Sequence, residues 1–379
     1  MPFPSITRDT RAFSISAFAL LLSTTACSDP VTSVASPLAV RASVTASVTA
    51  TAAPTVTAIG NIVGYGVNDD GTIVGPSTGN RSSAYLWAQP VGLELLGTGG
   101  LAWDISGDGS TVGGKNSAEK PVVWTSTSLA GPWTENVLGD ASFGGAVRAI
   151  ASDALGVPVR MTGNVWRSGA TKTPARWSSC TVEPGCTNGW LLTTVTVTPP
   201  ITEAWGQDIN PSGMIVGMEG SGCCRAAFWD ANDVQSVLQP AAAGAAAAAW
   251  GINDAGTVIV GQSNSIAVAW VRASTSFDFA TIMPIALEGS KTCKGGGTSI
   301  AYAVNPDFAT AGTIVGQACG APVAWKVNVA TVPVSIVKVV LPSSGRSGSG
   351  AAHSINRSTS AAHRIAGQVN GAGAYWTNF

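Results

Sequence analysis

From about residue 57 onwards, short apolar stretches alternate with tight turns, and one such pattern recurs seven times along the chain. Each copy has an apolar strand ending in Ile-Asn or a similar pair, a turn, a strand of the Gly-Thr-Ile-Val-Gly type, a second turn, and a strand ending in Trp. The copies repeat about every 48 residues, a period typical of β-propeller blades. We expect the closing tryptophans to fill the wide outer wedge between neighbouring sheets. These residues are Trp87, Trp124, Trp177, Trp229, Trp270, Trp325 and Trp376.

The first turn of a copy carries a hairpin signal. An Asn opens this turn and a Gly closes it three residues later, as at Asn68 and Gly71. Because an Asn side chain bonds the turn backbone and Gly accepts a positive φ, each copy is expected to begin with a β-hairpin. The third copy has no such Asn and no Asp-x-Gly, so its first hairpin is the least well defined. The same signal recurs at Asn210 and Gly213, at Asn253 and Gly256, and in variant form at Ser106 and Gly109.

A fourth apolar stretch follows the Trp-ending strand, as at residues 92–97, 191–197 and 334–340. Four antiparallel strands make one blade, and blades that cannot each cover both faces alone close into a ring. The sequence therefore predicts an all-β fold, a seven-bladed β-propeller over residues 54–379. The seventh copy ends shortly after its Trp, and residues 55–60 precede the first copy without a blade of their own. We predict that this N-terminal strand completes the last blade.

The start of the chain has the pattern of an export signal. A positive n-region with Arg8 and Arg11 precedes an apolar h-region over residues 12–22. Small residues at 24–26 then form a cleavage site. Residues 1–27 are therefore predicted to be a signal peptide with a lipobox-like end.

Cys27 directly follows the cleavage site and resembles the acylated cysteine of bacterial lipoproteins. Thr24 stands where such boxes usually carry Leu, and ordinary cleavage and release is the alternative to lipidation. Ser28, where an Asp would suggest inner-membrane retention, favours the outer membrane. Residues 28–53 consist mostly of Ser, Thr, Ala, Val and Pro, a composition typical of a disordered tether. We expect a location in the cell envelope, as an outer-membrane lipoprotein anchored through its N-terminal lipid only, or as a secreted protein.

The remaining six cysteines agree with export, because disulfides form in oxidising compartments. Cys180 and Cys186 flank a Pro-Gly turn, which favours a local bridge. Cys293 falls in a loop between blades and Cys319 in a turn of the next blade, so a bridge between them is also expected. The adjacent cysteines at 223–224 form either a vicinal bridge or two free thiols.

The repeat motif resembles a known family. It combines small-aromatic-Gly-Ile-Asn, Asp-x-Gly, Ile-Val-Gly and Ala-x-Leu-Trp, and is carried in the first copy by residues 65–68, 70–75 and 84–87. This pattern resembles the HAF repeat of extracellular bacterial proteins over about residues 57–379. The resemblance implies a propeller-like fold and an extracellular location, and the family brings no generally assigned reaction. A weaker similarity to the Asp-box turns of sialidase propellers concerns structural turns.

Charge and motifs narrow the function classes. With 20 Lys and Arg against 21 Asp and Glu, the formal net charge of −1 provides no basic field for nucleic acid. The sequence has no GxSxG elbow, HExxH motif or EF-hand loop, and its two histidines are His353 and His363. We expect no cofactor and no metal, and favour a non-enzymatic protein. Paired carboxylates that meet in the channel of the propeller stay open as an alternative.

One register position, three residues before the turn Asn, is occupied by large or polar side chains in all seven copies. Strand geometry places it near one mouth of the central channel, where aromatic rings with Arg, Gln and His resemble a platform for a sugar or aromatic ligand. The alternative is that these side chains are wedges packed between blades. Asp104 and Asp208 are the next residues in two copies and add carboxylates near the channel. The seven positions are Tyr65, Trp103, Arg148, Gln207, Trp250, Tyr302 and His353.

The fold by itself does not select among functions, because propellers serve many. The favoured function is a lipid-anchored binding or scaffolding module of the cell envelope. The alternative is a carbohydrate-binding or carbohydrate-active protein, a lectin, lyase or hydrolase, that uses the channel mouth. A third interpretation takes the low surface charge as a sign of self-association into extracellular arrays. The expected partner is therefore an envelope protein or a glycan.

Overall fold

The computed structural model describes most of the chain from residue 53 onwards. The predicted signal peptide, with Cys27, and nearly all of the predicted tether lie outside the described residues. In the described part of the chain, no helix is long and apolar enough to cross a membrane. The described ranges are 53–79, 82–139, 142–167, 171–182, 189–197, 203–220, 224–274, 278–288, 293, 297–343, 349–357 and 363–378.

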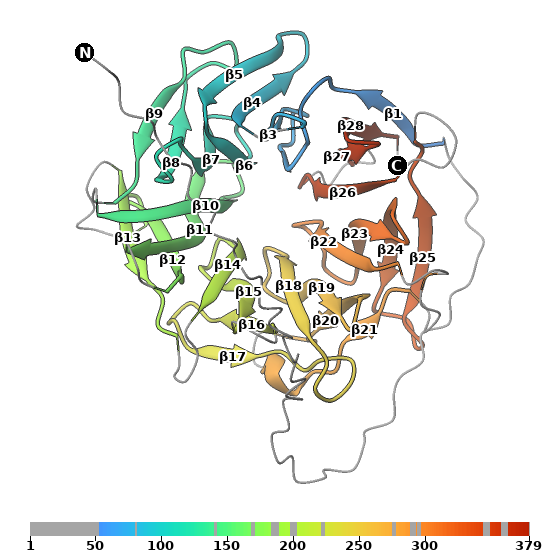
Figure 1. Ribbon diagram of the computed structural model, residues 1–379. Coiled ribbons are helices and arrows are strands. Elements are labelled where there is room, and N and C mark those ends of the chain that lie inside the picture. The colour runs from blue at the N-terminus through green and yellow to red at the C-terminus, as the bar shows by residue number, and fades with distance from the viewer. Residues whose placement is uncertain are drawn as a thin grey trace, which may run out of the picture. The chain divides into compact units, whose positions relative to one another are not determined.

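The described strands form seven four-stranded sheets arranged around a central axis, which confirms the predicted seven-bladed propeller (Figure 1). In blades 1 to 6 the strands follow chain order from the channel outwards. Blades 1 to 3 comprise β2 (Gly66–Val67), β3 (Ile73–Pro76), β4 (Ser83–Ala88) and β5 (Gly92–Thr98); β6 (Leu101–Ile105), β7 (Thr111–Lys115), β8 (Pro121–Thr125) and β9 (Thr134–Val137); and β10 (Phe143–Ser152), β11 (Pro158–Arg167), β12 (Thr173–Ser179) and β13 (Trp190–Thr194).

The second half of the ring repeats this plan. A 3-10 turn, η1 (Phe279–Thr281), lies between the third and fourth strands of blade 5. Blades 4 to 6 comprise β14 (Ala204–Ile209), β15 (Ile215–Glu219), β16 (Arg225–Trp229) and β17 (Gln235–Val237); β18 (Ala247–Ile252), β19 (Val258–Ser263), β20 (Ile266–Val271) and β21 (Ile285–Ala286); and β22 (Ser299–Val304), β23 (Ala311–Ala318), β24 (Ala321–Asn328) and β25 (Ser335–Val340).

Blade 7 joins the two ends of the propeller. Its three inner strands are β26 (Gly350–Ile355), β27 (Ile365–Val369) and β28 (Ala372–Thr377), and its outermost strand is β1 (Thr55–Ala58). β1 pairs with β28 in antiparallel register, from Thr55 opposite Thr377 to Ala58 opposite Ala374. The ring is therefore closed by the N-terminal strand that the sequence predicted, as the blue β1 beside the red β28 shows in Figure 1.

The closing tryptophans pack between neighbouring blades. Six of the seven are fully buried, and Trp124, for example, shares a core cluster with Val74 and Leu86 of the preceding blade. Trp87 is half-buried and contacts Tyr375 of blade 7, with ring centroids 5.8 Å apart. The predicted core role is confirmed for the six, and Trp87 has the same position at the seam where the ring closes.

Blade 3 has the first hairpin that the sequence defined least well, and its turn uses a residue that the sequence analysis did not identify. Asp153 opens this turn in place of Asn, and its Oδ1 accepts hydrogen bonds from the amides of Leu155 and Val157. Gly156 closes the turn with a φ of 85°, and its amide donates to the Asp153 carbonyl. The turn lies two residues later than in the other copies because the first two strands, β10 and β11, are ten residues long.

The disulfide predictions are confirmed in part. Cys293 and Cys319 form a bridge with a Cα–Cα distance of 5.2 Å, which ties the linker before blade 6 to a turn of that blade. Cys180 is disulfide-bonded, and its predicted partner Cys186 lies outside the described residues. Cys224 is a half-buried free thiol, and Cys223 lies outside the described residues.

Candidate ligand-binding site in the central channel

A β-bulge in the first strand of the blade aims one side chain into the channel. In blade 5, Ala249 pairs with Gly261 and Gly251 with Val260, so Trp250 has no partner across the ladder. The bulged residue in blades 2 to 7 is in every case the one that the sequence analysis selected. In blade 1 the equivalent Tyr65 directly precedes β2. Bulges are known to re-aim side chains next to functional sites. The six bulged residues are Trp103, Arg148, Gln207, Trp250, Tyr302 and His353.

The last Gly of the Gly-Thr-Ile-Val-Gly pattern makes room for this bulge. A Cβ on Gly217 would lie 1.8 Å from the carbonyl oxygen of Trp205, closer than any non-bonded contact allows. The equivalent glycine of each of the other six blades would meet the equivalent carbonyl oxygen at 1.7 to 2.1 Å. The repeated glycine therefore allows the bulge to form, and the bulge directs the side chain into the channel.

The seven aimed side chains form a floor across the channel. Each of them lines two chambers, one on either side. His353 contacts Tyr65 and Tyr302, with ring centroids 5.0 and 4.9 Å apart, and Tyr302 contacts Trp250 at 5.9 Å. All seven are half-buried and line the channel, and the contacts among them join Tyr65, His353, Tyr302 and Trp250 in one group and Arg148 and Trp103 in another. They also lie deeper than the mouth position predicted from the sequence.

The larger chamber, of about 700 Å³, opens towards the linkers between blades and is called the wide chamber here. Its wall carries aromatic faces beyond those of the floor, from Trp166 of β11 and from Trp205 of β14. Polar groups come from Asn164 and Gln207, and the charged groups include Lys172, which lies in the turn between β11 and β12. This mixture of flat apolar surfaces and separate polar groups is typical of small-molecule sites.

The cations of blade 3 stand against aromatic rings of the wide chamber. The guanidinium of Arg148 stacks 4.3 Å from the ring centroid of Trp103, and burial lowers the pKa of Arg148. Lys172 Nζ lies 5.9 and 5.8 Å from the ring centroids of Trp166 and Trp205. Cation–π contacts of this kind contribute about 0.5 to 2 kcal/mol each.

Buried polar atoms of three wide-chamber residues lack a hydrogen-bond partner among the described residues and bear on a ligand. They are Nε of Arg148, Oδ1 of Asn164 and Nε1 of Trp250. Asn164 is 3% exposed, so its amide oxygen is both desolvated and unbonded. Leaving such a group unpaired costs about 1 to 3 kcal/mol, and each case calls for an explanation.

The smaller chamber, of about 190 Å³, lies on the hairpin-turn side of the floor and is called the narrow chamber here. The carboxylate of Asp104 accepts hydrogen bonds from the backbone amide of Ile105 at 2.9 Å and from that of Ile150 in blade 3 at 2.7 Å. The carboxylate of Asp208 accepts hydrogen bonds from the backbone amides of Ile209 and of Ile252 in blade 5, both at 2.8 Å. Burial is the main cause that raises the pKa of each to about 7. Both carboxyl groups therefore link neighbouring blades.

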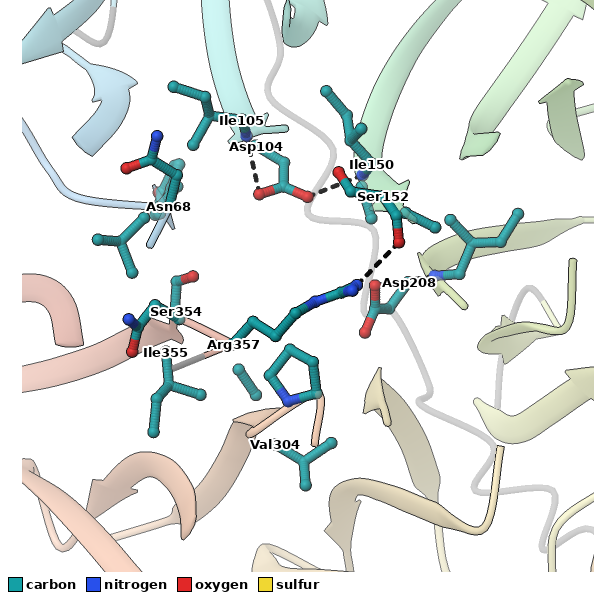
Figure 2. A pocket seen from close by; sticks show the side chains of 18 of the residues that line it. Asn68, Asp104, Ile105, Ile150, Ser152, Asp208, Val304, Ser354, Ile355 and Arg357 are labelled. Carbon is teal, nitrogen blue, oxygen red and sulfur yellow. Dashed lines mark hydrogen bonds between the residues drawn. The ribbon is translucent and has the colours of Figure 1, made fainter. Parts of the chain in front are cut away.

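Arg357 of blade 7 crosses the narrow chamber, as Figure 2 shows from its extended side chain directed at Ser152. Its guanidinium donates to the carbonyl oxygens of Ser152 and Asp153 in blade 3, both at 2.8 Å, and forms an ion pair with Asp254 of blade 5 at 2.7 Å. Burial raises the pKa of Asp254 to about 6, although the Arg357 charge opposes this shift. One side chain thus ties three blades together on this side.

The sequence analysis identified the seven floor residues, but it did not identify most of the other residues that line the two chambers. Asn164, Trp166 and Lys172 belong to the third copy, in which the repeat is degraded, and a surplus of aromatic and polar residues there was the available signal. Arg357 gave no signal, because its partners lie about 100 to 200 residues away in the chain. Among the described residues, no group of three His, Cys, Asp or Glu side chains is placed to hold a metal ion.

Comparisons with known proteins bear on the fold. No protein-family model matches the chain, and no curated protein matches it. A structure of U3-55K is similar over 86% of this chain and 99% of its own, with a TM-score of 0.53 and 12% identity. The WD40 repeats of RRP9 match over 86% and 98%, with a TM-score of 0.53 and 13% identity. A structure of the Mitotic Checkpoint Complex matches over 94% and 99%, with a TM-score of 0.50 and 13% identity. At these identities the similarity establishes the propeller fold alone.

Proposed function

We propose that this protein is a binding module of the cell envelope that holds its ligand in the wide chamber. The observation that carries the proposal is the floor of seven side chains, positioned by a glycine in each blade and by a bulge in blades 2 to 7, beneath a chamber with unpaired polar atoms. The similarity to a chain of the Mitotic Checkpoint Complex structure, which is by name an assembly, agrees with a binding role.

The envelope location is part of the same proposal and is supported by the sequence. Residues 1–27 have the pattern of a lipoprotein signal peptide, and the repeats resemble those of the extracellular HAF family. Lipid anchoring predicts that cells expressing the full chain incorporate a labelled fatty acid into it, and that Cys27→Ser abolishes the label. A wild-type chain that is exported without label would overturn the anchor and leave a secreted protein.

The ligand that best fits the wide chamber is a saccharide. Sugar rings present a flat apolar face for stacking on Trp and a rim of hydroxyl groups for hydrogen bonds, and the chamber offers both kinds of contact. We propose binding rather than hydrolysis or lyase chemistry. Glu119 is the carboxylate that lines this chamber among the described residues, and it is exposed and paired with Lys115 at 2.5 Å.

The test is saccharide binding by the full chain, purified from membranes in detergent and titrated with a panel of oligosaccharides by calorimetry. We expect Trp250→Ala and Trp205→Ala each to weaken binding about fivefold or more, because each removes a stacking surface worth about 1 kcal/mol or more. Trp190→Ala is the matched control, since Trp190 lies on the outermost strand of blade 3. Failure of the wild-type chain to bind any saccharide, or equal binding by Trp250→Ala, would overturn the proposal.

A further inference from the structure

The charges of the wide chamber do not balance among the described residues. Four charged side chains line it, and Lys115 and Glu119 form an ion pair with each other. The other two, Arg148 and Lys172, have no carboxylate within ion-pair distance among the residues that the structure describes. Both belong to blade 3, so the positive charge is confined to one sector of the wall.

An unpaired, half-buried guanidinium is costly, because burial in low dielectric disfavours the charged form. The lowered pKa of Arg148 reflects this desolvation. The carboxylate of Asp104, which is next to the floor residue Trp103, accepts two backbone amides on the narrow side. Nothing in the described chain therefore neutralises Arg148 from the wide side.

The geometry of Arg148 suits a carboxylate ligand. Its guanidinium stacks on the face of Trp103, which leaves the N–H groups in the guanidinium plane for an acceptor. Nε has no hydrogen-bond partner in the described chain, and a carboxylate binds such an edge through two parallel hydrogen bonds. Lys172, above Trp166 and Trp205, adds a second positive charge on the same side.

The neighbouring groups specify the rest of the ligand. Oδ1 of Asn164 needs a donor such as a hydroxyl group, and Nε1 of Trp250 needs an acceptor. The rings of Trp166 and Trp205 need a flat apolar partner. A chamber of about 700 Å³ lies within the usual range for small-molecule sites.

We infer that the wide chamber binds an acidic saccharide, with the carboxylate of a uronate residue on Arg148 and Lys172 and the sugar rings against the tryptophans. This inference rests on the proposed function and narrows it from saccharides in general to those that carry a carboxylate. It assigns Arg148 and Lys172 the recognition of charge, and Asn164 and Trp250 the recognition of hydroxyl groups.

The test compares a uronate oligosaccharide with its carboxyl-reduced counterpart, which has the same rings and linkages without the charge. The full chain in detergent is titrated with each by calorimetry at low and moderate salt. We expect the uronate to bind at least tenfold more tightly, and this preference to shrink as salt is raised. In Arg148→Met and Lys172→Met the preference should fall towards unity, while affinity for the neutral counterpart stays within about twofold.

Two controls keep the result specific. Lys338→Met removes one positive charge from β25 on the outer rim of blade 6 and should leave the preference unchanged. The thermal midpoint of Arg148→Met should equal or exceed that of the wild type, because an unpaired buried cation is replaced by an apolar side chain.

The outcomes separate the two proposals. Equal binding of the uronate and its reduced counterpart would overturn the acidic-saccharide inference and leave the proposed function standing. Binding of neither would overturn both. A preference for the uronate that survives in both variants would overturn the roles of Arg148 and Lys172.

Discussion

The two chambers of the channel share one floor, yet they differ in charge and in how that charge is held. The narrow chamber is acidic. Its carboxylates at Asp104 and Asp208 accept backbone amides of the next blade, and Arg357 holds Asp254 and two carbonyl groups. The wide chamber is basic, and two of its cations, Arg148 and Lys172, lie over aromatic rings without a carboxylate partner among the described residues.

This difference separates structural charge from charge that is available to a ligand. A charged group tied to a neighbouring blade holds the ring together, and its removal is expected to cost stability. A charged group without a protein partner destabilises the empty molecule, so its removal is expected to cost binding and spare stability. Variants on the two sides of the floor should therefore have opposite effects, and the experiments below test this expectation.

The largest loss of stability is expected from a variant that disrupts the floor, which both chambers share. Gly217→Ala places a Cβ 1.8 Å from the Trp205 carbonyl oxygen, so the bulge at Gln207 cannot form without displacing β14. We expect the unfolding free energy to drop by at least about 4 kcal/mol, the range reserved for severe core disruption, as measured by urea denaturation.

Gly97→Ala is the matched control for this variant. The nearest atom to its Cβ, on Trp124, lies at an ordinary contact distance of 3.4 Å, so the loss should stay below about 1 kcal/mol. Near-wild-type stability of Gly217→Ala would mean that the bulge does not depend on this glycine, and that another feature directs Gln207 into the channel.

The floor also shows how far sequence reasoning reaches. The number of blades, the closing strand and the seven channel positions were all predictable, because a signal repeated seven times averages out the ambiguity of any one strand. The depth of the floor was not predicted, because a bulge is invisible in the strand that contains it. Its signal lies on the next strand, in the glycine that pairs beside it, as Gly261 does beside Trp250.

Features that do not repeat were harder to predict. The turn at Asp153 was missed because two longer strands shift it, and a shift breaks the alignment on which the repeat analysis depends. The crossing Arg357 was missed because it belongs to one copy and bonds to blades 3 and 5, whereas repeat patterns report on neighbouring blades. Asn164 and Lys172, which line the wide chamber, likewise belong to one copy only.

A smaller effect is expected from the crossing arginine of the narrow chamber. Arg357→Met removes two hydrogen bonds to blade 3 and leaves Asp254 without its ion-pair partner. We expect the unfolding free energy to fall by about 2 to 3 kcal/mol, in the range for losing hydrogen bonds to a charged group. Saccharide affinity in the wide chamber should stay within about twofold of wild type.

Lys338→Met serves as the control for the crossing arginine, because Lys338 is exposed and Glu288, its ion-pair partner at 3.0 Å, keeps a hydrogen bond from Trp325 Nε1. Its removal should cost less than about 1 kcal/mol. If Arg357→Met weakens saccharide binding without loss of stability, then the two chambers act as one site, and the division between structural and available charge fails.

The smallest expected effect is the pH dependence of the unfolding free energy that arises from protonation of Asp208 in the narrow chamber. The pKa of Asp208 is about 7 in the folded chain, above its ordinary value of 3.8, so the folded state keeps a proton that the unfolded state has released. The unfolding free energy should therefore fall as pH rises from about 4 to 7, with a contribution of up to about 1.4 kcal/mol per pH unit from this carboxyl group. Above about pH 7 this contribution to the slope should vanish.

Asp208→Asn removes that contribution while keeping one oxygen to accept a backbone amide, so its stability should fall less steeply with pH than that of the wild type. Urea denaturation between pH 4.5 and 7.5 measures the two slopes, and Asp70→Asn, at an exposed turn residue, should keep the wild-type slope. Equal slopes for Asp208→Asn and wild type would mean that Asp208 is ionised throughout. Burial would then not raise the pKa of Asp208, and its two hydrogen bonds to backbone amides would hold a carboxylate that is charged at every pH tested.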